Sequence, residues 1–365
     1  MKPEIAEINL LGTGGGYGES LVIHLANNEW IVIDSCIDPN SKESLPLKFL
    51  KEKGIDLSNV QLILCTHWHD DHIRGISSLL KYCPNAIFST SKVTGKKKFL
   101  QIVGLEHQKE NFSASNSSTK EFHKCLEIID KREKPLKLSE IDKTLYSTTY
   151  KNIDIKIHSL SPSDYSARLF DHEISELMDR YSPVNKKIPN QSLNDRSVVL
   201  LLEIGSHSVL LGADLEVKSN PDLGWLDIIH NSQTVKTAYP SKYYKIPHHG
   251  SSNGYHSDIF DNLLGKNPIG SLTPRHPSPS LPTEKMMEKY GSLMKELYFT
   301  SNPHNSSKPK KRDHKTTKII KKINSSVQEI RFNYGIITSR VNILNSGNEW
   351  HTISEGDGFI YGSSP

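Results

Sequence analysis

Hydrophobic residues in the first third of the chain fall into short runs, and the spacing within each run predicts strands alternating with helices. Residues 45–53 carry apolar side chains at helical spacing up to Gly54, and residues 75–82 predict a second short helix. The strand runs are residues 5–11, 20–25, 30–34 and 60–66. The last run is apolar apart from Gln61, as expected for a strand covered on both faces. The pattern indicates a mixed α/β fold.

Strand patterns return after a long polar stretch in the middle of the chain. Residues 104–146 are rich in Ser, Asn, Lys and Glu, and we interpret them as an insertion with a helix at about residues 120–130. Residues 304–322 form a basic segment. Further strands are expected at residues 153–160, 197–204, 207–211, 243–247, 269–273, 329–345 and 349–353, and a helix at 283–297. With no internal repeat, we expect residues 1–365 to form a single domain.

Composition restricts the class of protein. The 365 residues are 35% hydrophobic and 24% charged, which suits one large globular domain. No apolar stretch approaches the ~20 residues that a membrane-spanning helix needs, and Glu4 and Glu7 stand where an export signal would be apolar. The four cysteines are widely spaced and predict reduced, buried thiols. We expect a cytoplasmic protein with no membrane association, and its net charge of +4 permits a polyanionic partner without demanding one.

Of the 17 histidines, three stand together directly after the buried strand of residues 60–66, in the sequence THWHDDH. His67 and His69 lie two apart, so extended backbone places both rings on one side. Asp71 and His72 follow at the turn into the next helix. Such a cluster beyond the carboxyl end of a strand, where α/β sheets bind ligands, predicts a metal site. A solvated polar loop is the other interpretation, but it gives no reason for the HxHxDH spacing.

The HxHxDH motif resembles the signature of the metallo-β-lactamase superfamily, and three other features match it in order. Asp34 ends the strand IVIDS, Asp214 follows Gly212-Ala213 after a predicted hairpin, and His248 lies in PHHGS. Within the superfamily, NDRSVVLLLE, KIPHHGSS and RHPSPSLPTEKM look most like the metallo-hydrolase domain of ComEC-type DNA-uptake proteins. The resemblance implies a four-layer αββα sandwich, over roughly residues 5–300, with the last strands completing the second sheet.

The resemblance also implies a site for two divalent metal ions. Asp34 would orient histidines of that site, and Asp214 would bridge the two metals. Mixed His/Asp ligation suits Zn²⁺ best, with Mn²⁺ as the alternative. One metal would be held by His67, His69 and Asp214, and the other by Asp71, His72, Asp214 and His248.

Several positions leave alternatives open. Many members of the superfamily supply a further histidine where this chain has Ser161-Pro162-Ser163-Asp164, so Asp164 or a water molecule would complete the first metal's ligands. One of the adjacent pair His248 and His249 can bind metal, while the other donates a proton or is structural. His276 matches a position near the mouth of the site, and Arg275 beside it could clamp a phosphate. The expected catalytic residues are Asp71, His249 and His276.

We therefore expect a binuclear metal-dependent hydrolase, with a phosphodiesterase or nuclease as the first hypothesis. A hydrolase of a small molecule (a cyclic nucleotide, thioester or lactone) is the second, and an effector subunit whose metal site a protein partner controls is the third. The glycine-rich loop at residues 12–18 would line the rim of the site and could approach a phosphate. Nucleic acid is the candidate partner for Lys96-Lys97-Lys98 and for the basic segment, although a solvated surface explains both as well.

Overall fold

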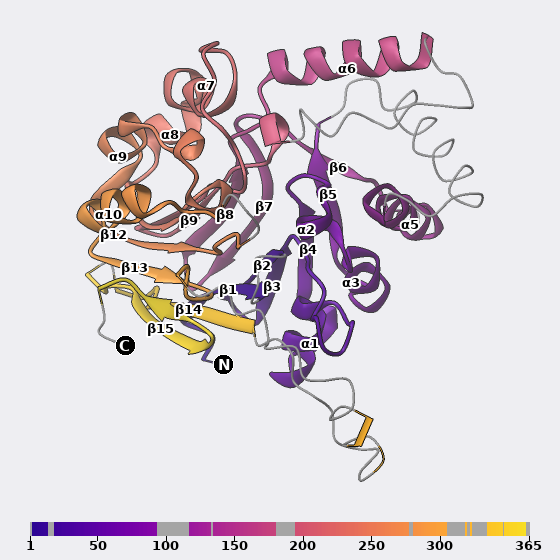
Figure 1. Ribbon diagram of the computed structural model, residues 1–365, viewed down its shortest axis with the longest axis horizontal. Coiled ribbons are helices and arrows are strands. Elements are labelled where there is room, and N and C mark those ends of the chain that lie inside the picture. The colour runs from indigo at the N-terminus through magenta and orange to yellow at the C-terminus, as the bar shows by residue number, and fades with distance from the viewer. Residues whose placement is uncertain are drawn as a thin grey trace.

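Two sheets, each of eight strands, stand face to face in the computed structural model of this chain (Figure 1). The structure describes residues 2–13, 18–92, 117–132, 134–179, 194–276, 280–304, 318–319, 322, 334–345 and 347–362. The first sheet has the order β15(His351–Gly356), β14(Tyr334–Asn342), β1(Ile5–Thr13), β2(Glu19–Ala26), β3(Glu29–Ile33), β4(Val60–Cys65), β5(Ile87–Ser91) and β6(Lys137–Ser139). The second has the order β16(Phe359–Ile360), β13(Glu296–Phe299), β12(Leu264–Leu272), β11(Ser241–Lys245), β10(His207–Leu211), β9(Leu200–Ile204), β8(Ile153–Ser159) and β7(Lys143–Tyr150).

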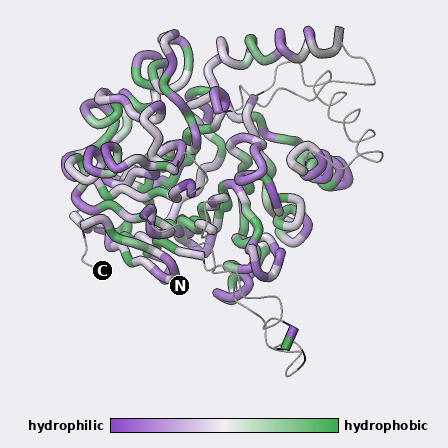
Figure 2. The backbone as a smooth tube through the Cα atoms, viewed as in Figure 1, coloured by the Kyte–Doolittle hydropathy of each residue, from purple (hydrophilic) through white to green (hydrophobic). Residues whose placement is uncertain are grey.

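Alternating side chains of the strands supply three separate apolar cores. In β3, Ile31 and Ile33 face the second sheet, while Val32 packs on the opposite side of the first sheet. In β9, Leu202 faces the first sheet and Leu201 packs outward. Figure 2 shows hydrophobic positions following the strands in the middle of the molecule. Because both faces of both sheets are covered, strands near the centre read as continuous apolar runs.

Helices cover the outer face of each sheet and complete the four-layer αββα sandwich that the resemblance implies. Those on the first sheet are α1(Leu45–Glu52), α3(Ile76–Tyr82) and α5(Ser117–Lys131), and those on the second are α7(Gly224–Asn231), α9(Ser257–Asn262) and α10(Glu284–Leu293). The other helical segments are α2(Asp70–Ile73), α6(Asp164–Asp179), α8(Gln233–Thr237), η1(Leu57–Asn59), η2(Asn194–Arg196), η3(His248–Gly250) and η4(Ser252–Gly254).

Two sequence-based expectations about the fold need correction. Phe122 and Cys125 of α5 are buried in the core beneath the first sheet, and β6 and β7 extend the two sheets, so residues 117–146 belong to the layered fold rather than to an insertion. Residues 104–116 of that stretch lie outside the described residues. The helix expected to reach Leu297 ends at Leu293, because Glu296–Phe299 pairs with β12 as a parallel strand.

Other expectations agree with the structure. β2 and β3 form the predicted hairpin, with Asn27 and Asn28 both at positive φ as a tight turn requires. All four cysteines are free and buried. Among the described residues, no helix combines the length and apolar character needed to cross a bilayer. Most of the basic segment at 304–322, and Lys96-Lys97-Lys98, lie outside the described residues.

Candidate metal centre

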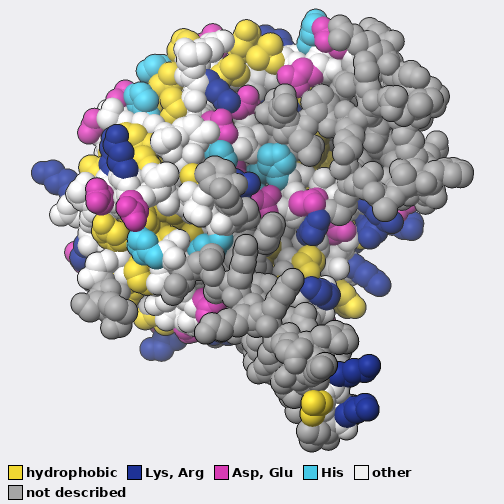
Figure 3. Space-filling model, in the orientation of Figure 1, with side chains coloured by type: hydrophobic (Ala, Val, Ile, Leu, Met, Phe, Trp, Pro, Cys, Tyr) yellow, Lys and Arg dark blue, Asp and Glu magenta, His cyan; other side chains and the backbone are white. Residues whose placement is uncertain are grey.

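The candidate site lies where the carboxyl ends of parallel strands from both sheets meet. β3, β4, β5 and β6 run parallel in the first sheet, and β10, β11, β12 and β13 run parallel in the second. The THWHDDH segment directly follows β4. Asp214 follows β10, and His248 and His249 follow β11. Segments more than 140 residues apart are thereby brought to one edge, and on the face drawn in Figure 3 histidine and acidic side chains reach the surface together near its middle.

Three imidazole rings of the site are held by the protein through Nδ1. His72 Nδ1 donates to Asp34 Oδ2 at 2.8 Å, and His249 Nδ1 donates to the carbonyl oxygen of Thr273 at 2.9 Å. His67 Nδ1 lies 3.1 Å from the hydroxyl of Ser197. A proton held on Nδ1 leaves Nε2 as the lone-pair atom, which is the arrangement found in metal-binding histidines.

Asp34 fixes more than one of these rings. Its Oδ1 accepts the backbone N–H of Thr66, and its Oδ2 accepts the Thr66 hydroxyl, each at 2.7 Å. The same hydroxyl lies 3.0 Å from His67 Nδ1. Burial raises the pKa of Asp34, an effect that the adjacent His72 opposes. Asp34 therefore orients His72 directly and His67 through Thr66, in agreement with the orienting role that the resemblance implies.

The carboxylate of Asp214 stands at the centre of the three rings. Its Oδ2 is 3.4 Å from His72 Nε2, 3.8 Å from His249 Nε2 and 3.9 Å from His67 Nε2. Asp71 Oδ2 lies on one side of this group, 3.7 Å from His249 Nε2 and 3.9 Å from His72 Nε2. The Asp71 side chain is 29% exposed and that of Asp214 only 4%, so Asp71 is the carboxylate that faces solvent.

The ionisation of the cluster favours a bound cation. Burial acts to raise the pKa of Asp214 and of Asp71, but His72 and His249 together outweigh it, and both carboxyls have pKa values well below their usual range. Burial acts to lower the pKa of His72, yet Asp214, Asp71 and Asp34 together hold it well above its ordinary value. Burial and then His72 lower the pKa of His67. The buried carboxylates thus create a field that attracts positive charge.

The donor atoms fit a metal ion. Within the described part of the chain, His67 Nε2 and His72 Nε2 are buried and make no hydrogen bond. Two groups of ligand atoms each lie within 4.8 Å of one another, namely His67, His72 and Asp214, and Asp71, His72 and His249. Buried polar atoms without partners are costly in a folded protein, and a metal ion would satisfy them together. Nitrogen and carboxylate donors in such groups suit Zn²⁺.

The geometry favours His249 over His248 at the position where the sequence predicts a ligand. His248 Nδ1 lies 3.0 Å from Asn253 Oδ1 and 3.3 Å from Glu216 Oε1, and its Nε2 is 3.3 Å from Asn194 Nδ2. His249 instead contacts Asp71 and Asp214. Both residues have positive φ, 48° and 54°, so the ring directions depart from those of regular backbone. This conformation cannot be read from the order of two adjacent histidines.

The other predicted residues lie around the cluster rather than in it. The ring of His69 stands edge-on to that of His67, with centroids 4.8 Å apart, and His69 is in neither ligand group. Asp164 pairs with Lys92 Nζ at 2.9 Å, which does not support it as a ligand. His276 Nε2 lies 3.1 Å from the hydroxyl of Ser301. Arg275 is paired through its backbone with Leu281. Contact of His276 or Arg275 with substrate stays a prediction.

The end of the glycine-rich loop touches the metal-binding segment. Gly18 has φ +97°, and a Cβ placed on it would lie 2.7 Å from the carbonyl oxygen of Asp71 and 2.4 Å from Cys36 Cβ. Only glycine therefore allows the loop to approach the Asp71 backbone so closely. This contact agrees with the expected position of the loop at the rim, while residues 14–17 lie outside the described residues.

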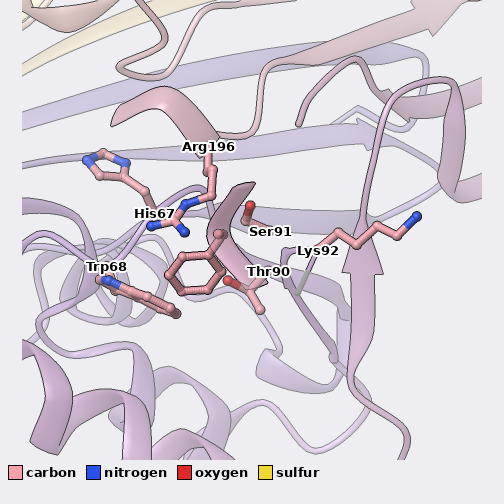
Figure 4. A pocket seen from close by; sticks show the side chains of 7 residues that line it. His67, Trp68, Thr90, Ser91, Lys92 and Arg196 are labelled. Atoms are coloured by element: carbon pink, nitrogen blue, oxygen red, sulfur yellow. The ribbon is translucent and has the colours of Figure 1, made fainter. Parts of the chain in front are cut away.

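A small pocket, about 260 Å³ when the solvent at its open mouth is included, lies on the His67 side of the cluster (Figure 4). Arg196 lies over the ring of Phe170, with its guanidinium carbon 3.3 Å from the ring centroid. Burial lowers the pKa of Arg196 to about 10, so the group stays charged at neutral pH. In Figure 4 Lys92 extends away from the other side chains, and it pairs with Glu140 and Asp164. The lining residues are His67, Trp68, Thr90, Ser91, Lys92, Phe170 and Arg196.

Two supporting groups were not anticipated from the sequence. The hydroxyl of Ser197 accepts the backbone N–H of Asp214 at 3.0 Å and contacts His67, so it ties the two halves of the site together. Lys245 is 1% exposed and pairs with Glu19 behind Asp214. The sequence carries one signal for Lys245, because this lysine stands between the apolar residues Tyr244 and Ile246 at the end of a predicted strand. Buried lysines are rare unless they are paired with an acidic group.

Comparison with protein families supports the same superfamily. The family model of the metallo-beta-lactamase superfamily matches residues 13–98, which include the THWHDDH segment. Comparison with curated protein sequences gives no significant match.

Solved structures with similar folds include the metallo-beta-lactamase fold protein YhfI from Bacillus subtilis, with 11% identity, 80% of this chain and 94% of that chain covered, and a TM-score of 0.40. Human tRNase Z, short form, has 11% identity, 79% and 89% coverage, and a TM-score of 0.34. The dizinc quorum-quenching lactonase AidC has 16% identity, 53% and 55% coverage, and a TM-score of 0.31. At these TM-scores none of the three carries an argument about this chain.

Proposed function

We infer that the chain is a hydrolase of the metallo-β-lactamase superfamily, and we propose that it uses two divalent metal ions to cleave phosphodiester bonds, with nucleic acid as the first candidate substrate. The observation that carries the proposal is the position of Asp214 Oδ2, which lies within 3.9 Å of Nε2 of three imidazoles. His67, His72 and Asp214 would hold one ion, and Asp71, His249 and Asp214 the other, with His72 close to both and His69 completing the first.

Each residue of the site has a definite task in this proposal. When bound, divalent ions activate water at neutral pH and polarise the oxygen of a phosphoryl or carbonyl group. Asp34, Ser197 and the Thr273 carbonyl orient the three rings. Asp71, as the most exposed carboxylate of the cluster, would position the attacking water. His276 would contact substrate near the mouth.

Three features support a phosphodiester over a carbonyl substrate. The pocket beside His67 contains a charged guanidinium together with the hydroxyls of Thr90 and Ser91, and these groups suit a phosphate oxygen. Gly18 brings the glycine-rich loop against Asp71. The NDRSVVLLLE and KIPHHGSS segments resemble the metallo-hydrolase domain of ComEC-type DNA-uptake proteins, which favours DNA among the nucleic acids.

A small-molecule hydrolase is the second candidate, because the pocket beside His67 is small and is lined in part by Trp68 and Phe170. Its candidate substrates are a cyclic nucleotide, a thioester and a lactone. Control of the metal site by a protein partner, and a cytoplasmic location, stay predictions.

The test is a substrate panel with one protein preparation stripped of metal and then reloaded with Zn²⁺ or Mn²⁺. The panel contains single-stranded DNA, RNA, bis-p-nitrophenyl phosphate, a cyclic nucleotide, a thioester and a lactone. We expect metal-dependent cleavage of phosphodiesters that is lost in Asp71→Ala. Cleavage of the carbonyl compounds alone would establish the second candidate. Undiminished phosphodiester cleavage by the metal-free protein would overturn the proposal.

A further inference from the structure

Behind the candidate metal centre, a buried ion pair joins the two sheets. Glu19 begins β2 in the first sheet, and Lys245 ends β11 in the second. Lys245 Nζ contacts Glu19 Oε1, and the two side chains are 1% and 5% exposed. A lysine and a glutamate this deeply buried are retained only with a close partner. The pair is therefore a fixed structural contact behind the candidate metal centre.

The ammonium group of Lys245 also reaches the segment that carries Asp214. Lys245 Nζ donates to the carbonyl oxygen of Ala213 at 3.0 Å and lies 3.9 Å from Asp214 Oδ1. The same Ala213 carbonyl accepts the backbone N–H of His248 at 3.0 Å. Lys245 thus contacts a carbonyl that joins the loop after β10 to the loop that carries His249.

The backbone at this junction needs such support. Ala213 has φ +45°, a left-handed conformation that residues with a side chain rarely adopt. A Cβ on Gly212 would lie 2.9 Å from the carbonyl oxygen of Lys245, so β10 and β11 approach closely there. Positive φ values of this kind persist where the surroundings hold them, and they cluster at functional sites.

The two oxygens of Asp214 face different groups. Oδ2 faces the three imidazoles, at 3.4–3.9 Å, while Oδ1 faces the ammonium group of Lys245. Attraction between Lys245 and Oδ1 holds the carboxylate in the rotation that turns Oδ2 toward the rings. Glu19 balances the charge of Lys245, so that the ammonium group does not repel a cation in the cluster.

We propose that Lys245, supported by Glu19, is a positioning residue that sets the rotation of the Asp214 carboxylate and the left-handed turn before it, and thereby the geometry of the metal centre. The inference rests on the proposed function, because it assumes that Asp214 binds metal. Lys245 itself touches neither substrate nor metal in this account.

The experiment compares Lys245→Met, Glu19→Gln, the double variant and a matched control, Arg340→Met. Arg340 pairs with the buried Glu7 across β1 and β14, away from the metal centre. Each protein is stripped of metal, its melting temperature is measured, and Zn²⁺ affinity is determined against a competing chelator. The visible absorption spectrum of the cobalt-loaded protein reports the geometry around the metal.

We expect Lys245→Met to lower the melting temperature, weaken Zn²⁺ binding by roughly 10- to 100-fold and change the cobalt spectrum. In the double variant no lone buried charge remains, so the melting temperature recovers, while the weaker binding and altered spectrum persist. Arg340→Met lowers the melting temperature and leaves the spectrum unchanged.

A double variant that regains the wild-type affinity and spectrum would overturn the positioning role and leave the pair a purely structural one. Unchanged affinity and spectrum in Lys245→Met would overturn it as well. If the wild-type protein binds neither Zn²⁺ nor Co²⁺, the proposed function itself fails. Normal metal uptake by the wild type therefore separates failure of this inference from failure of that proposal.

Discussion

The two halves of the candidate metal centre come from different sheets and are built in different ways. The half from the first sheet is a single segment, residues 67–72, that leaves β4 and enters α2. The half from the second sheet combines Asp214, His249 and Lys245 from the ends of two strands. The first half is recognisable as a motif, whereas the second is assembled by strand pairing over a long stretch of chain.

Backbone conformation explains why the halves differ in how well a sequence predicts them. His67 leaves an extended strand, and His69 has φ −67° and ψ 152°, so the period of the strand gives the ring directions. In the second half, Ala213, His248 and His249 all have positive φ. There the side-chain directions depend on contacts such as the Ala213 carbonyl with Lys245 and His248. Spacing on extended backbone therefore identified His67, whereas it could not decide between His248 and His249, whose backbone is left-handed.

The largest effect is expected at Asp214, which serves both halves. Asp214→Asn keeps the shape of the side chain but removes the charge that faces three imidazoles. We expect both metal ions to be lost or severely weakened and activity to fall by on the order of 10³-fold or more. Elemental analysis and a rate measurement on the same sample check this. Two tightly bound ions in the variant would refute the central position of Asp214.

The next largest effect, on metal affinity, distinguishes His249 from the adjacent His248. His249→Asn and His248→Asn form a matched pair, because asparagine tolerates the left-handed backbone that both positions require. We expect His249→Asn to weaken metal binding by more than about 100-fold, beyond the usual range for supporting residues, and His248→Asn to change it by less than about 10-fold. Metal titration measures both. The reverse order would restore the assignment expected from the sequence.

A smaller effect is expected in the first half when the support of a ring is removed. Asp34→Asn abolishes the carboxylate that accepts from His72 Nδ1 and from Thr66. Affinity for Zn²⁺ should fall by roughly 10- to 100-fold while the metal can still be driven in at high concentration. Chelator competition gives the affinity. Wild-type affinity in this variant would mean that the ring is held by other contacts.

The smallest effect is expected at Asp164, which the sequence offered as a ligand of the first metal. Its side chain is 69% exposed and pairs with Lys92. Asp164→Ala should leave the number of bound metal ions unchanged and lower the free energy of unfolding by no more than about 1 kcal/mol, as for other exposed ion pairs. Loss of one metal ion would show that Asp164 binds metal after all.

Much of the fold was predictable because both sheets are covered on both faces. The apolar runs at residues 60–66 and 207–211 and the Asn27-Asn28 turn each give a local signal that matches β4, β10 and the β2–β3 hairpin. The polar composition around α5 concealed its role, since only one face of the helix, with Phe122, Cys125 and Ile129, is buried. In such a charged stretch, the apolar face of an amphipathic helix can be recognised as a core face only when the sheet against which it packs is known.

In the site, the positions that carry the resemblance could be named from the sequence, and the supporting contacts between the two sheets could not. His67, Asp71, His72 and Asp214 lie together as the resemblance implies. Ser197 could not be assigned, because its link between His67 and Asp214 exists only once the two sheets pack. The pair of Glu19 and Lys245 could not be predicted for the same reason, because the two residues are 226 positions apart and lie in different sheets.

The most direct test of the central claim, that both halves together form one binuclear metal centre, is the metal content of the purified wild-type chain after reloading and removal of loosely bound ions. Elemental analysis should give two equivalents of Zn²⁺ or Mn²⁺ per chain, falling to less than one in Asp214→Asn. A wild-type chain that retains no stoichiometric metal, or an Asp214→Asn variant that retains two equivalents, would contradict the account.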